Sequence, residues 1–170
     1  INIEMMQKGL DDVFKNNNPL LTPAASNECM QKQLGIFAAE KSEADKSGGI
    51  AFLEANKKRK GVITLPSGLQ YEVIKSGDVN GPLPKIVDTV EVNYIGTLID
   101  GIEFDNSYKR GQPYATPLTR VVKGWTEILQ LMRVGDQWKV YIPSELAYEG
   151  NGAAGGAIPP YAVLVFDMTL

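Results

Sequence analysis

Apolar and polar residues alternate with a helical period along the first part of the chain. Between residues 3 and 14 the apolar side chains recur mostly three or four positions apart, which predicts an amphipathic helix with Ile3, Met6, Leu10, Val13 and Phe14 on one face. The run Asn16–Pro19 is expected to end this helix. Thr22 and Pro23 then predict an N-cap followed by proline at the first position of a second helix.

The second predicted helix is long and runs from Ala24 to Lys58, through a stretch rich in Ala, Glu, Lys and Gln. Its apolar residues form a narrow stripe made of Met30, Leu34, Phe37 and Ala38. Because a stripe this narrow is not buried within one small domain, we expect the helix to project, with any bend at Ser47–Gly49. A second copy of the chain would cover the stripe; the alternative is that it packs against the domain that follows.

After Gly61 the helical spacing gives way to strand alternation bounded by Gly and Pro. Three alternating sets predict half-buried strands, namely Leu69, Tyr71 and Val73; Val90, Val92, Tyr94 and Leu98; and Trp138, Val140 and Ile142. Val163–Leu170 is apolar on both faces and predicts a central strand. Gly124–Met132 carries the one helical pattern in this part. We therefore predict an α+β fold, in which a helical module with a long connecting helix (1–60) precedes a twisted antiparallel sheet wrapped around one short helix (61–170).

The amino-acid composition argues against several classes of catalytic site and binding partner. The chain has 17 basic and 20 acidic residues and no histidine, so histidine-dependent nucleophilic catalysis and the common zinc sites are not expected, and neither is a metal or cofactor. Without a basic stripe, nucleic acid is not an expected partner. The lone Cys29 is interpreted as a packing residue on the long helix. No apolar run approaches the ~18 residues needed to span a bilayer, and the start at Ile1 suggests a processed or trimmed chain.

The strongest signal is a series of short motifs in the second part of the chain. In order they are Val92–Leu98 with Asp100-Gly101, Phe104–Ser107, Val121–Trp125, Ile142–Ser144 with Ala147-Tyr148, Ala157–Pro160, and Leu164–Asp167. This ordered series resembles the FK506-binding-protein type of peptidyl-prolyl cis/trans isomerase. Gly61–Tyr71, with Met6–Leu10 and Phe52–Lys58, resembles the macrophage-infectivity-potentiator-like bacterial subgroup, whose members carry an N-terminal helical dimerisation module.

The resemblance implies a site with two kinds of residue. Tyr94, Phe104, Val121, Val122, Trp125, Ile158 and Phe166 would line an aromatic pocket with Trp125 as its floor, and Tyr114 would contribute a further aromatic. The Tyr148 hydroxyl and the Ile158 backbone N–H would donate to carbonyls of the bound peptide. Asp105 would lie at the edge of the pocket in an orienting and electrostatic role, paired with Arg110. The catalytic set would be Asp105, Tyr148, Tyr94, Phe104 and Phe166.

Two positions depart from the family pattern. Pro113–Leu118 has Thr116 where relatives have phenylalanine, while an aromatic appears at Tyr114, so one wall of the pocket is expected to differ. The loop from Tyr148 to Pro159 is one residue longer than is usual, and Glu149 stands where glycine is usual. We expect this glycine-rich loop to be mobile and to alter substrate preference and inhibitor affinity.

The leading hypothesis is therefore a prolyl isomerase that assists protein folding. Its partners would be proline-containing or unfolded polypeptides, FK506- or rapamycin-like inhibitors, and a second copy of the chain joined through the N-terminal helices. The alternatives are a non-catalytic module that binds proline-containing or unfolded segments and, more remotely, a purely structural dimer module. The subgroup implies a periplasmic or outer-membrane-associated location, with the cytoplasm as the alternative.

Overall fold

The chain forms two compact units, residues 1–41 and 42–170. The structure, a computed structural model, describes residues 7, 9, 11, 12, 14, 15 and 23–170. Most of the helix expected at Ile3–Phe14 therefore lies outside the described residues, together with its Ile3, Met6, Leu10 and Val13, and so does the N-cap expected at Thr22. The described residues between 7 and 14 are helical, and Phe14 is exposed.

Helix α2 (Pro23–Asn56) confirms the long helix and begins at the predicted proline. It continues through Ser47–Gly49 without a break, so the glycine pair does not interrupt it. The predicted stripe is exposed in this chain, with Phe37 at 61%. Cys29 is also exposed, so the packing role expected for it is wrong; its neighbours along the helix, residues 26–41, are exposed as well.

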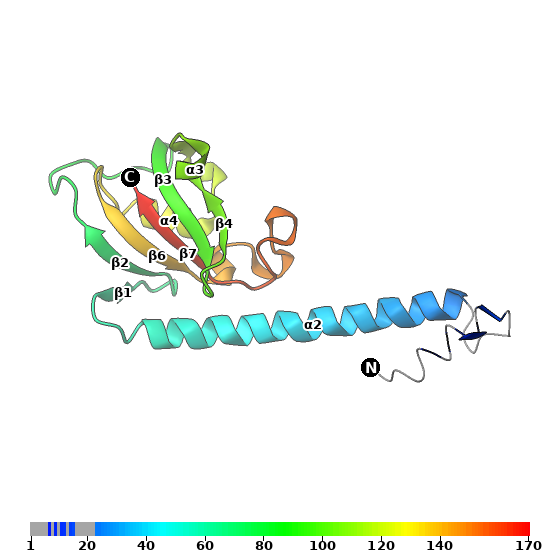
Figure 1. Cartoon of the computed structure of the whole chain (residues 1–170). Helices are drawn as coiled ribbons and strands as arrows, with labels where there is room; N and C mark the ends of the chain where they lie inside the picture. Colours follow the sequence, from blue (N-terminus) through cyan, green and yellow to red (C-terminus); the bar gives the residue numbers. More distant parts are fainter. Residues whose placement is uncertain (1–6, 8, 10, 13, 16–22) are drawn as a thin grey trace. The chain divides into compact units, whose positions relative to one another are not determined.

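The second unit is built on one antiparallel sheet of seven strands in the part of the chain that the structure describes, and Figure 1 shows it curving around a short helix. The strands are β1 (Val62–Thr64), β2 (Gln70–Lys75), β3 (Thr89–Leu98), β4 (Glu103–Asn106), β5 (Tyr114–Pro117), β6 (Gln137–Ile142) and β7 (Leu164–Thr169). Their order is β1-β2-β6-β7-β3-β4, and β5 pairs with β3. The predicted fold class and the central position of the last strand are thus confirmed.

The short helix inside the curve is α4 (Lys123–Leu129). Trp125, Ile128 and Leu129 of this helix are buried in the core, and so is Met132, which follows it. Full burial of such a side chain contributes about 1.5–3 kcal/mol, so α4 anchors the concave side of the sheet.

Short helical turns that the periodicity did not predict join the strands. They are α3 (Ser107–Arg110), η1 (Leu118–Arg120), η2 (Ser144–Leu146), η3 (Glu149–Asn151) and η4 (Ala154–Gly156). α3 forms because the Asn106 side chain accepts hydrogen bonds from the N–H groups of Tyr108 and Lys109.

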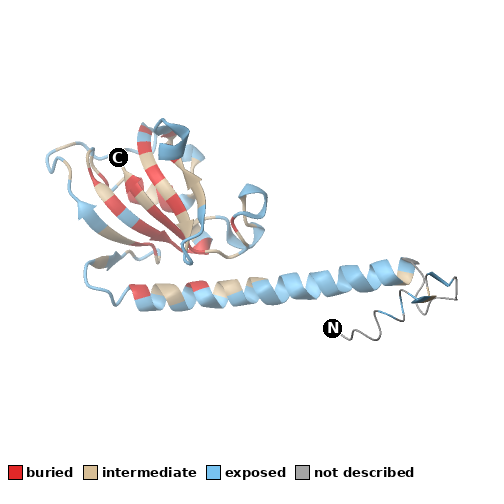
Figure 2. Cartoon of the chain, in the orientation of Figure 1, coloured by how far each residue is buried: buried red, intermediate tan, exposed pale blue. Residues whose placement is uncertain are grey.

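The C-terminal end of α2 packs against the convex side of this sheet. Figure 2 shows that the buried residues of the helix lie toward this end. Gly49 is buried because a Cβ there would lie 2.9 Å from Cγ2 of Val163, and the rings of Phe52 and Tyr141 are 5.9 Å apart. Packing against the following domain is therefore seen for the C-terminal end of the helix.

A buried polar network completes this contact. The Asn56 amide donates to Oε1 of Gln70 at 2.9 Å, and the Gln70 amide donates to the Leu53 carbonyl at 3.0 Å. Arg59 donates to Asn56 and to the Tyr141 hydroxyl. Gln70 and Tyr141 are both buried where α2 packs on the sheet, although they alternate with the apolar residues that face the core.

Replacing Asn56 by alanine tests how much this network contributes. The substitution leaves Oε1 of the buried Gln70 without its donor, which typically costs about 1–3 kcal/mol. We expect the free energy of unfolding in urea to fall by that amount in Asn56→Ala and to change by less than about 0.5 kcal/mol in the exposed Lys58→Ala. Equal effects of the two substitutions would show that the end of α2 is not held by this bond.

Candidate functional site

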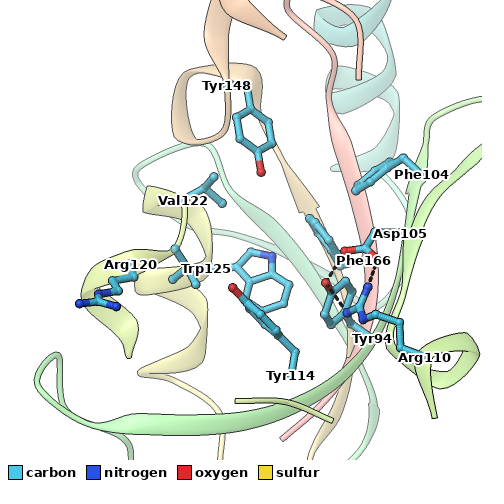
Figure 3. A pocket seen from close by; sticks show the side chains of 11 residues that line it. Tyr94, Phe104, Asp105, Arg110, Tyr114, Arg120, Val122, Trp125, Tyr148 and Phe166 are labelled. Atoms are coloured by element: carbon cyan, nitrogen blue, oxygen red, sulfur yellow. Dashed lines mark hydrogen bonds and ion pairs between the residues drawn. The ribbon is translucent and has the colours of Figure 1, made fainter. Parts of the chain in front are cut away.

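A cavity of about 670 Å³ opens at the concave side of the sheet. Figure 3 shows its lining side chains, which are Tyr94, Phe104, Asp105, Arg110, Tyr114, Arg120, Val121, Val122, Trp125, Tyr148 and Phe166. Every predicted site residue except Ile158 is therefore brought to one place, from segments far apart in the sequence.

The floor of the cavity consists of aromatic rings that meet edge to face. Tyr94 from β3, Trp125 from α4 and Phe166 from β7 form a mutual triangle, with centroid distances of 4.9 Å (Tyr94–Trp125), 5.2 Å (Trp125–Phe166) and 5.8 Å (Tyr94–Phe166). Such pairs contribute about 0.5–1.5 kcal/mol each beyond their burial, so the rings are fixed before any ligand arrives. Trp125 is only 5% exposed, as expected for a floor.

Glycine at position 96 lets two of the rings approach each other. Gly96 pairs with Phe166 across β3 and β7. A Cβ built on it would lie 2.7 Å from the Phe104 ring and 2.9 Å from the Phe166 ring. Because there is no Cβ, the Phe104 and Phe166 rings meet at a centroid distance of 5.6 Å and form one wall of the cavity.

One charged cluster lies at the edge of the aromatic floor. The Tyr94 hydroxyl and the Arg110 guanidinium both donate to Asp105, and the Asn106 N–H donates to the same carboxylate at 2.8 Å. Arg110 also donates to the Tyr94 oxygen at 2.9 Å. The predicted pairing of Asp105 with Arg110 is thus present in the structure, and Tyr94 completes the cluster.

These contacts set the protonation states of Asp105 and Tyr94. Burial raises the pKa of Asp105, but the hydrogen bonds from Tyr94 and the Asn106 N–H and the charge of Arg110 outweigh it and hold that pKa below its usual value. Burial, with the hydrogen bond to Asp105, raises the pKa of Tyr94 to about 12. At neutral pH Asp105 is therefore ionised and Tyr94 is a neutral donor.

Tyr148 lines the side of the cavity that faces the aromatic floor. Figure 3 shows its hydroxyl pointing into the cavity from above the Trp125 indole. Burial and the charges of Tyr114 and Asp105 raise the pKa of the Tyr148 phenol, so it is also a neutral donor at neutral pH. The donor role of Tyr148 stays a prediction.

Ile158 does not line the cavity. Its side chain is buried in the core, and its N–H donates to the Ala153 carbonyl at 3.1 Å within a short bridge of the loop. The N–H predicted to meet a peptide carbonyl is therefore already bonded in this structure.

In β5, which departs from the family pattern, Tyr114 rather than residue 116 lines the wall of the cavity. Thr116 is buried in the strand and does not line the cavity, whereas Tyr114 does. The Tyr114 ring meets Tyr94 and Trp125 edge to face at 6.1 and 6.3 Å. Arg120 also lines the cavity and was not predicted; its one sequence signal is its place immediately before Val121, at the end of the turn η1.

Two family models together cover most of the chain. Residues 81–170 match the model described as FKBP-type peptidyl-prolyl cis-trans isomerase, and residues 1–73 match the domain amino terminal to that isomerase. The chain belongs to the FKBP-type peptidyl-prolyl cis-trans isomerases. It is accordingly an isomerase of X-Pro bonds, and the alternative of a purely non-catalytic binding module is not favoured.

Relatives of this FKBP-type isomerase place it in the expected subgroup. It is 41% identical to the outer membrane protein MIP of Legionella longbeachae over 177 residues, covering 100% of this chain and 75% of the relative. It is 46% identical to the isomerase FkpA of Aeromonas hydrophila over 169 residues, covering 96% of this chain and 62% of the relative. The crystal structure of FkpA from Escherichia coli matches with a TM-score of 0.83 and 37% identity, over 100% of this chain and 81% of that one.

The ionised Asp105 at the edge of this FKBP-type site predicts that part of the protein's stability is lost at acid pH. Because the pKa of Asp105 is lower in the folded state, its ionised form adds stability above the unfolded pKa of about 3.9, and that stability is lost as the pH falls through the folded pKa. The unfolding free energies of wild type and Asp105→Asn should therefore converge as the pH is lowered from about 6 to 2. Urea titrations at each pH measure this, with the exposed Glu91→Gln as control; a constant difference would contradict the stabilised carboxylate.

Proposed function

We propose that this cavity catalyses isomerisation by holding the proline ring on its aromatic floor while the preceding carbonyl turns out of conjugation. The single observation that carries this proposal is the closed triangle of Tyr94, Trp125 and Phe166 with one ion cluster at its edge. A dry aromatic surface accepts the ring, and the edge provides a fixed field next to the turning carbonyl.

The physical argument concerns the resonance of the amide. Rotation about an X-Pro bond meets a barrier of about 18–20 kcal/mol because the C–N bond has partial double-bond character. A twisted amide has lost that resonance and is less polar than a planar one. An apolar cavity therefore destabilises the twisted form less than the planar forms, and the barrier falls without any covalent step.

The polar groups orient the peptide under this proposal. The Tyr148 hydroxyl would donate to a substrate carbonyl, while Phe104, Val121 and Val122 contact the proline ring. Asp105 is ionised and so accepts hydrogen bonds but cannot donate them; Tyr94 and Arg110 already occupy it. Its role would be electrostatic rather than acid or base. The predicted donation by the Ile158 N–H would require its bond to Ala153 to open.

Asp105→Asn tests the electrostatic role. The substitution keeps the size of the side chain and removes its charge, so we expect kcat/KM on a short X-Pro peptide to fall about tenfold, equivalent to ~1.4 kcal/mol, in a folded enzyme. Because no proton is transferred, wild-type activity should be flat between about pH 6 and 9. A loss of several thousandfold with an intact fold, or a bell-shaped pH profile, would mean that Asp105 acts as an acid or base.

We further propose that FK506- and rapamycin-like molecules bind in the same cavity, with a proline-like ring over Trp125. Binding should quench the indole fluorescence of Trp125, because the ring would lie against it, and should compete with the peptide substrate. Trp138 is buried and does not line the cavity, so it serves as the internal reference: the quench should persist in Trp138→Phe and disappear in Trp125→Phe. Lack of competition at high micromolar drug would contradict this assignment.

The helical part supports a second proposal, that residues 1–60 form a homodimerisation module and bind unfolded chains. The exposed stripe of Met30, Leu34 and Phe37 is an apolar surface that a second copy would cover. Residues 1–73 match the domain amino terminal to the isomerase. The division after residue 60 is part of this proposal.

We also propose an exported, periplasmic or outer-membrane-associated location, which the similarity to an outer membrane protein supports. No helix among the described residues could cross a membrane.

Sedimentation of a charge variant tests the dimer. Leu34→Glu places a carboxylate in the stripe, so we expect it to be monomeric at tens of micromolar where the wild type is dimeric. Gln33→Glu adds the same charge at the neighbouring exposed position and should leave the dimer intact. The monomeric variant should keep its activity on a short peptide and lose part of its activity on an unfolded protein. A monomeric wild type would refute the module as a dimerisation element of this chain.

A further inference from the structure

The loop that carries Tyr148 over the cavity is held in place by a residue outside the site. The N–H of Tyr161 donates to the carbonyl of Glu149 at 2.7 Å, directly after Tyr148. The Tyr161 ring also lies against Gly150, because a Cβ built there would be 2.8 Å from its hydroxyl oxygen and 3.0 Å from Cζ. Tyr161 thus contacts the two residues that follow Tyr148.

The backbone of this contact is unusual. Glu149 has φ 50° and Tyr161 has φ 58°, which are left-handed conformations that L residues adopt at a cost. Such conformations persist where the surrounding contacts hold them. The bond and the ring contact between the two segments are contacts of this kind.

Tyr161 also contacts the C-terminal third of α2. The Lys46 ammonium lies 5.4 Å from the centroid of the Tyr161 ring. One turn further along, Gly49 lies against Val163, and a Cβ on it would be 3.8 Å from the Tyr161 carbonyl oxygen. The same short segment, 161–163, therefore contacts both the helix and the loop.

We propose that Tyr161 is a positioning residue that links the docked end of α2 to Tyr148, so that the seating of the helix sets how tightly the substrate peptide is held. This inference rests on the donor role proposed for Tyr148. Lys46 and Gly49 hold the segment, Tyr161 holds Glu149 and Gly150, and these hold Tyr148 over the cavity. The helix acts on binding without touching the substrate.

The proposal predicts a change in KM rather than in kcat. Tyr148 would contact the bound peptide in the ground state and the transition state alike, and loss of such uniform binding raises KM and leaves kcat unchanged. A purely structural defect would instead lower the amount of active enzyme, which reduces the apparent kcat and leaves KM unaltered.

Tyr161→Asn removes the ring and keeps the backbone, because asparagine tolerates a positive φ better than most residues. We expect KM for a short X-Pro peptide to rise about fivefold while kcat stays within about twofold. Tyr148→Phe should raise KM as well, and adding Tyr161→Asn to it should produce little further change, because both act through the same hydroxyl.

A pair of adjacent glycines provides a matched test of the helix. Gly49→Ala would press its Cβ against Val163, whereas no described atom lies within 4 Å of a Cβ built at Gly48. Both substitutions favour the helix equally. We expect Gly49→Ala to raise KM by about threefold, Gly48→Ala to leave it unchanged, and Gly49→Ala with Val163→Ala to restore it.

The outcomes distinguish a failure of the link through Tyr161 from a failure of the donor role proposed for Tyr148. If Tyr148→Phe raises KM but Tyr161→Asn and Gly49→Ala do not, the link through Tyr161 is wrong and the role of Tyr148 stands. If Tyr148→Phe itself leaves KM unchanged, the proposed donor role fails and the inference fails with it. If Gly48→Ala and Gly49→Ala change KM equally, helix propensity rather than seating is responsible, and the inference is overturned.

Discussion

The absence of a side chain at Gly96 is the constraint on which the cavity depends. Gly96 faces Phe166 across the two central strands, and a Cβ would overlap both that ring and Phe104. With the space empty, the Phe104 and Phe166 rings close one wall and Phe166 completes the triangle with Tyr94 and Trp125. A larger residue would have to move a ring or separate the strands, and either would open the dry surface that the reaction needs.

A dry aromatic floor disfavours a charged group beside it. The hydrogen bonds and ion pair that join Asp105, Tyr94 and Arg110 stabilise the charge of the carboxylate there. Burial disfavours the carboxylate, and the hydrogen bonds and the guanidinium outweigh that cost, so that the pKa of Asp105 still falls. The charge is therefore fixed in place before the substrate binds. Such a group provides a constant field, whereas an unpaired carboxylate in the same position would take up a proton and act as an acid or base.

Much of this could be predicted from the sequence because strand alternation and the ordered motifs carry local information. The alternating residues of β3 and β6 are buried as expected, apart from Leu98, which is partly buried, and ten of the predicted site residues line one cavity. What was missed depends on turns, loop bonds and helix contacts that periodicity does not report. Gln70 and Tyr141 are buried by α2, the Ile158 N–H is taken by Ala153, and Arg120 reaches the cavity through a turn that has no periodicity. Cys29 was expected to pack but is exposed, as are the described residues around it on the helix.

Helix α2 belongs to both compact units, which gives the Ser47–Gly49 segment a different meaning from the bend first expected there. The helix is continuous, so the glycines are not needed for flexibility. Gly49 instead lets the helix approach Val163 more closely than any other residue would, whereas Gly48 meets no described atom. A glycine in a helix costs about 1 kcal/mol relative to alanine, and at position 49 that cost accompanies a close approach in which Asn56 and Gln70 are buried and Phe52 is partly buried. The C-terminal part of the helix is thereby seated both on the sheet and on the segment 161–163 that contacts the loop over the cavity.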